Sequence, residues 1–76
     1  MNGHTEVDMS EKVFKKIRVT GCSDKSIERA IEVAVERASK SVHGMGWFEL
    51  VELRGAVKDG GVTEWQVSVD IGFKLD

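Results

Sequence analysis

The chain has 76 residues, which is enough for one domain with a core that is small relative to its surface. Its only cysteine, Cys22, excludes an intrachain disulfide, and no paired Cys/His spacing typical of a structural zinc site occurs. A net charge of −2 argues against a nucleic-acid binder, which needs a dense basic surface. We find no signal-peptide pattern and no apolar run of the ~20 residues that span a membrane, so we expect a cytoplasmic protein without a membrane partner.

Residues 1–11 are polar and show no periodicity, so we expect a flexible leader before a single domain over 12–76. His4 lies in this leader without partner residues nearby, and we do not predict it to be a ligand. The segment 12–20 is rich in β-branched residues and alternates Ile17 and Val19 with basic residues. It predicts a first strand that ends at Gly21.

The next segment predicts the one long helix. Apolar residues recur at three- and four-residue intervals from Ile27 to Val42, as on the buried face of an amphipathic helix. Ser23 or Ser26 can cap its start, because a serine hydroxyl accepts a bond from an unpaired backbone N–H. We expect the glycines at 44 and 46 to end it.

Segments 47–57 and 62–75 predict two further strands, joined by a tight turn at Asp59 and Gly60. The fold class is therefore α+β with element order β-α-β-β. A helical crossover makes the first two strands run the same way, so a three-stranded antiparallel sheet requires the third strand in the middle. Its apolar set is expected under the helix: Trp65, Val67, Val69, Ile71, Phe73 and Leu75.

One helix cannot cover this sheet. A helix over 27–42 is roughly 24 Å long, whereas the third strand extends over about 45 Å. The second strand reads as apolar on both faces, with one set at 47, 51, 53 and 57 and the other at 48, 50 and 56. The uncovered surface predicts association with further copies of the chain.

The sequence does not indicate an enzyme. Cys22 precedes the helix, and its only potential histidine partners are His4 in the leader and His43 beyond the far end of the helix. The glycines at 44 and 46 follow a helix and enter a strand, which is the reverse of the order in phosphate-binding loops.

Three residues are candidates for binding a ligand. Trp47 lies at the entry to the second strand, where one subunit covers a large ring poorly, and composition alone favours an interface plug over a binding platform. Arg54 and Gln66 interrupt apolar sequence with donors suited to a planar heterocycle or a phosphate, although surface positions are the simpler interpretation. With a three-residue loop over 59–61, Arg54 lies opposite Gln66 and about 23 Å from Trp47. A site using all three would join subunits.

From 12 to 75 the chain resembles the dodecin family, in the segments VFKKIRVTG, AIEVAVERA, WFELVELRG, KDGGV and WQVSVDIGFKL. The resemblance implies a hollow homododecamer that stores and shields a flavin, FMN or riboflavin, without catalysis. It implies that Trp47 stacks on the flavin ring, that Gln66 hydrogen-bonds its polar edge and that Arg54 lines the site. Lys74 is implied to meet a phosphate-bearing ligand, and coenzyme A is a further candidate ligand.

The chain departs from the family pattern at three positions. Arg18 stands where relatives usually carry glutamate, Gly46 stands where an acidic residue is common, and Trp65 replaces a tyrosine or phenylalanine. The first two favour an alternative, a flavin-free structural or interaction shell of the same fold. A third class, an enzyme using Cys22 or His43, ranks last.

Overall fold

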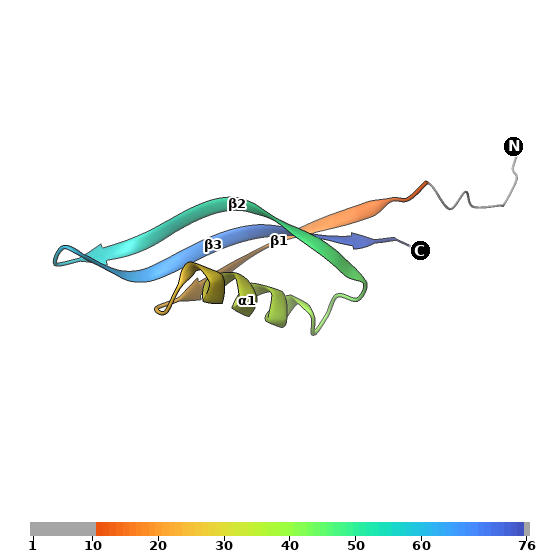
Figure 1. The fold of residues 1–76 in the computed structure, drawn as a ribbon. Helices are drawn as coiled ribbons and strands as arrows, with labels where there is room; N and C mark the ends of the chain where they lie inside the picture. The colour runs from red at the N-terminus through yellow and green to blue at the C-terminus, as the bar shows by residue number, and fades with distance from the viewer. Residues whose placement is uncertain (1–10, 76) are drawn as a thin grey trace, which may run out of the picture.

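The computed structural model describes residues 11–75, which form β1 (Phe14–Ser23), α1 (Ile27–Ala38), β2 (Met45–Lys58) and β3 (Gly61–Lys74). Both outer strands pair antiparallel with β3, in the sheet order β1-β3-β2. The predicted element order and the central third strand are therefore confirmed. The helix lies along one side of the sheet, and the β2–β3 hairpin extends beyond it (Figure 1). The predicted leader, with His4, lies outside the described residues except for Glu11.

The β2–β3 turn is tighter than a three-residue loop. Lys58 pairs with Gly61, which leaves only Asp59 and Gly60 in the turn, with φ of 51° and 81°. Positive φ at both central residues matches the twist of the flanking strands, and aspartate and glycine tolerate it well. The predicted turn residues are confirmed.

The prediction that the first strand ends at Gly21 was wrong. β1 continues to Ser23, and Gly21 pairs with Val67. The glycine is required by packing instead. A Cβ at this position would overlap the carbonyl oxygen of Ala30 in α1. Its absence allows the helix to approach β1 closely.

The helix is shorter than predicted. Ser26 caps its start, with its hydroxyl accepting the N–H of Arg29 at 2.9 Å. It ends at Ala38, well before the glycines at 44 and 46, so the predicted C-terminus was wrong. Serines cause the early end: the hydroxyl of Ser39 donates to the carbonyl of Glu36 at 2.6 Å, and such bonds compete with regular helix.

The core lies between the middle of α1 and the middle of β3. Its six buried members are Ala30, Ala34, Ala38, Val67, Val69 and Ile71. The predicted apolar face of β3 is thus covered only at its centre, while Trp65 and Phe73 are partly exposed and Leu75 is exposed. Within the described residues, the backbone of α1 lies close to β1 and β3 but not to β2, from which Met45 packs against the core. No helix in residues 11–75 has the length and apolarity to cross a membrane.

Candidate functional site

A one-residue register shift at Val51 decides which side chains of β2 share a face. Trp47 pairs with Gly72, and Arg54 pairs with Gln66, although Trp47 and Arg54 are an odd number of residues apart. In a regular strand they would point to opposite faces. The shift between Leu50 and Glu52 makes Val51 the extra residue and returns both to the same face.

The predicted division of β2 into two apolar faces was therefore wrong. We call the side of the sheet covered by α1 the helix face, and the opposite side the far face. On the helix face, β2 presents Phe48, Leu50 and Leu53 opposite the buried residues of β3. On the far face it presents Trp47, Glu49, Glu52 and Arg54 opposite Gly72, Asp70, Ser68 and Gln66.

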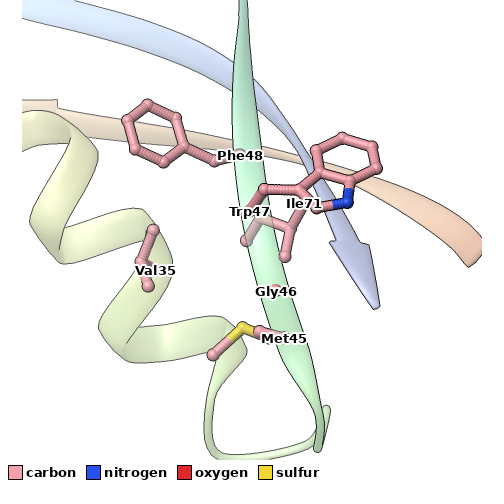
Figure 2. Close-up of a pocket in the computed structure, with 6 residues that line it drawn as sticks. All are labelled: Val35, Met45, Gly46, Trp47, Phe48 and Ile71. Atoms are coloured by element: carbon pink, nitrogen blue, oxygen red, sulfur yellow. The ribbon is translucent and has the colours of Figure 1, made fainter. Parts of the chain in front are cut away.

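A groove opens on the helix face where β2 passes the end of α1. It holds about 260 Å³ and is lined by Val35, Met45, Gly46, Trp47, Phe48 and Ile71. Figure 2 shows the side chains of Trp47 and Phe48 directed to opposite sides of β2, with Met45 and Val35 on the side of the helix. The groove is therefore an apolar margin of the helix face, and the indole itself belongs to the far face.

The indole of Trp47 lies directly over the backbone of Gly72. A Cβ on Gly72 would overlap the six-membered part of the indole, so only glycine leaves space for it. The ring of Phe14 flanks the indole, with 6.0 Å between ring centroids and a tilt of 48°. Trp47 is nevertheless 42% exposed. The arrangement offers a planar aromatic surface that is supported from below and from one side.

A charged network occupies the next positions along the far face. Arg18 binds Asp70 with two hydrogen bonds, from Nε to Oδ1 at 2.7 Å and from Nη2 to Oδ2 at 3.1 Å. Lys16 Nζ donates to Glu49 Oε1 at 3.1 Å and lies 3.7 Å from Asp70 Oδ2. These bonds lower the pKa of Asp70, chiefly through Arg18, and raise the pKa of Lys16, chiefly through Glu49. Arg18 thus has its own ion-pair partner.

Arg54 and Gln66 are cross-strand partners on the far face, as predicted. The reason differs from the prediction, because a further one-residue shift, which leaves Thr63 unpaired, replaces the longer loop. Cys22, on β1, is the other cross-strand partner of Gln66 and is exposed. The sequence placed Cys22 only before the helix. In the structure, Cys22, Gln66 and Arg54 lie side by side across the three strands.

The candidate site residues form two groups in one subunit. The first group, which we call the aromatic end, contains Trp47 with its indole over Gly72. Lys74 belongs to this end because it pairs with Phe14. The polar end consists of Arg54, Gln66 and Cys22. Gln66 and Gly72 are six residues apart along β3, which corresponds to about 20 Å. The subunit brings Arg54 to Gln66 but does not bring either to Trp47.

Sequence reasoning missed Phe14 and Gly72. The signal at Phe14 was its place in the alternation: it is an aromatic residue on the same face as Lys16 and Arg18, whereas Ile17 and Val19 point to the core. Gly72 interrupts the third strand without a turn nearby, which marks a close approach of another group. For metal binding, residues 11–75 contain no cluster of three or more His, Cys, Asp or Glu side chains that could hold an ion.

Comparison with known proteins gives a consistent result. The family model for Dodecin matches residues 13–76. Dodecin from Thermus thermophilus is 42% identical over 65 residues, covering 86% of this chain and 94% of that protein. Calcium dodecin from Mycobacterium tuberculosis is 32% identical over 63 residues, covering 83% and 89%.

Solved structures agree with these sequence matches. A Thermus thermophilus structure superimposes with a TM-score of 0.81 at 41% identity, covering 87% of this chain and 97% of that chain. Dodecin from Streptomyces coelicolor superimposes with a TM-score of 0.81 at 37% identity, covering 90% and 97%.

Proposed function

Because the chain belongs to the dodecin family, we propose that it binds a flavin, FMN or riboflavin, and stores and shields it in a homododecamer without catalysing a reaction. The observation that carries this proposal is the seat of Trp47. An exposed indole lies over Gly72 and against Phe14, and leaves an aromatic surface open to a planar ligand.

Stacking explains why such a surface suits a flavin. Aromatic rings attract each other in offset parallel or tilted arrangements, and a large flat heterocycle buries much apolar area on an indole. An electron-rich indole in contact with the ring also quenches its excited state by electron transfer. Storage and protection from light then follow from the same contact, and neither requires a catalytic group.

The two ends of the far face suggest how the ligand is oriented. Gln66 offers both donors and acceptors to the polar edge of the flavin ring, and Arg54 offers a planar cation to a phosphate. They lie about 20 Å from the seat of Trp47, further than one flavin ring extends, so the polar end that meets a stacked ring belongs to a neighbouring subunit. Lys74 lies at the aromatic end, where it suits a phosphate of FMN or of coenzyme A as a second ligand.

The helix face of β2 supports assembly. Phe48, Leu50, Leu53 and Val57 are 47–72% exposed and form a continuous apolar strip that α1 does not reach. Exposed apolar surface of this kind marks an interaction site, and further copies of the chain are the partner that we propose. The number of twelve subunits rests on the family resemblance.

The name of the Mycobacterium tuberculosis relative points to calcium, and we do not extend this ion to the present chain. Calcium requires several free oxygen ligands. On the far face, Asp70 and Glu49 are ion-paired with Arg18 and Lys16. Residues 11–75 also contain no group of three or more His, Cys, Asp or Glu side chains that could hold an ion.

Titration with FMN tests the proposal. Purified protein is added to FMN, and flavin fluorescence is followed together with the mass of the assembly. We expect strong quenching by the parent protein and by Trp65→Phe, which alters the tryptophan on the helix face. Trp47→Ala should form the same assembly and quench little. Unchanged fluorescence with the parent protein at micromolar concentration would contradict flavin binding and favour the flavin-free shell.

A further inference from the structure

Phe14 is an aromatic residue that does not pack in the core. It is the first residue of β1 and points to the far face, on the same side as Lys16 and Arg18. It is 40% exposed and does not belong to the buried cluster under α1. Its contacts are instead made with the end of β2, across the central strand.

The contact depends on a gap in β3. Trp47 on β2 pairs with Gly72, and Phe14 on β1 pairs with Lys74, two residues further along β3 on the same face, so Gly72 places no side chain between the two rings. Their ring centroids are therefore only 6.0 Å apart, inside the range of favourable aromatic pairs, and their planes are tilted by 48°. The buried backbone of Gly72 forms the floor, and Phe14 forms one wall.

Phe14 also lies near the backbone that precedes Trp47. A Cβ built on Gly46 would lie 3.7 Å from Cε2 of Phe14, an ordinary van der Waals distance. Gly46 sits at a register shift, where regular pairing with β3 does not fix the strand. The Phe14 ring thus lies beside both the indole and the irregular backbone that carries it.

We infer that Phe14 is a positioning residue, which holds the indole of Trp47 in the orientation that stacks on the ligand. The inference rests on the proposed flavin site, since it assigns a role within that site. A side chain that is already ordered loses less rotational freedom on binding, and this preorganisation corresponds to an affinity gain of about two- to tenfold. Phe14 itself need not touch the flavin.

The orientation of the indole is measurable without a ligand. The chain has two tryptophans, so Trp65→Phe leaves Trp47 as the only one. In this background, time-resolved fluorescence anisotropy reports the local motion of the Trp47 indole in flavin-free protein. We expect Phe14→Leu and Phe14→Ala to increase the amplitude of the fast component of the anisotropy decay. Phe14→Tyr, which keeps an aromatic ring, should retain the parent value.

The same variants are then titrated with FMN. We expect Phe14→Leu to weaken binding by about two- to tenfold, with Phe14→Tyr restoring it. Val13→Ala, which truncates the exposed side chain at the neighbouring position, is the matched control and should leave both readouts unchanged. The mass of the assembly is checked for every variant, and Phe14→Leu retains an apolar side chain where Phe14→Ala fails to fold.

The outcomes separate the two proposals. Unchanged anisotropy in a folded Phe14→Leu protein would overturn the positioning role, as would equal FMN affinity of Phe14→Leu and the parent. If the parent binds no FMN while Phe14→Leu increases indole motion, the proposed flavin function fails and Phe14 still positions Trp47.

Discussion

The two faces of the sheet differ in what their exposed residues have in common. On the helix face, the exposed part of β2 is aliphatic and aromatic, and it continues the core beyond the reach of α1. On the far face, side chains interact across strands through an aromatic pair, a charged network and a Thr20–Ser68 hydrogen bond of 2.7 Å. The helix face thus contributes the core, and in the function that we propose its exposed part serves assembly while the far face serves ligand binding.

The largest expected effect comes from a charge on the helix face of β2. Leu50→Lys places an ammonium in the apolar strip that we assign to subunit contacts, where an unpaired buried charge is strongly unfavourable. We expect the assembly to dissociate to smaller species in sedimentation or light scattering.

Glu32→Lys is the control, because it places the same ammonium on the exposed side of α1, which we assign to no subunit contact. It should retain the parent mass. A full-sized Leu50→Lys assembly would show that this strip is not an interface.

The second effect concerns the close approach of α1 to β1. Gly21→Ala places a methyl group against the carbonyl oxygen of Ala30, and such overpacking costs about 1–3 kcal/mol. Urea unfolding should shift accordingly. Gly46→Ala in β2 is the control, because its Cβ meets only ordinary contacts. Equal unfolding midpoints for both variants would contradict the role of Gly21 in packing.

The charged network predicts a pH dependence. The pKa of Asp70 in the folded protein lies below its ordinary value of 3.8, because Arg18 and Lys16 stabilise the carboxylate. A lowered folded-state pKa contributes stability above the ordinary value, and this contribution is lost as the pH falls through the folded-state pKa.

We therefore expect Arg18→Gln to lower the denaturation midpoint at pH 6, and the difference from the parent to shrink below about pH 4. Arg29→Gln is the control, since it removes a cation that pairs with Glu32 and Glu36 on the exposed side of α1. A difference that stays constant down to pH 2 would exclude Asp70 as the responsible group.

The smallest expected effect is a gain. Gly46→Asp introduces the acidic residue that the family resemblance leads us to expect at this position, and the site has space for a side chain. A new hydrogen bond to the ligand contributes about 1 kcal/mol, or roughly fivefold in affinity for FMN. The titration used for Trp47→Ala measures it, with Gly46→Ala as control. Unchanged affinity would indicate that the ligand does not reach this residue.

The sequence predicted the element order, the central third strand and the hairpin turn, because each rests on local periodicity or on turn residues with positive φ. It could not predict the faces of β2. Reading faces from periodicity assumes that successive residues of a strand alternate strictly between the two faces. The unpaired residues at the register shifts, Val51 on β2 and Thr63 on β3, interrupt this alternation, and they are visible only in the pairing of the two strands. The helix end was missed for a similar reason, since Ser39 bonds backward to Glu36 while Val42 continues the apolar spacing.

The sequence predicted which residues belong to the candidate site, but not how most of them lie relative to one another. Arg54 opposite Gln66 was correct, although the assumed loop was not, because the shift at Thr63 has the same effect on register as one more loop residue. Phe14 and Gly72 were missed because their role appears only when three strands are placed side by side. Trp47, Gln66, Arg54 and Lys74 remain proposed ligand contacts.

In the function that we propose, a flavin is held on the far face between subunits, with Trp47 from one subunit and Gln66 from another. A mixing experiment tests it directly. Trp47→Ala and Gln66→Ala proteins are refolded separately and then together in equal amounts, and FMN binding is measured.

Each variant alone should lack complete sites, whereas random mixing places intact Trp47 beside intact Gln66 in about a quarter of them. We predict that the mixture regains this fraction of high-affinity FMN binding. A mixture that binds no better than the average of the two separate proteins would contradict a site shared between subunits.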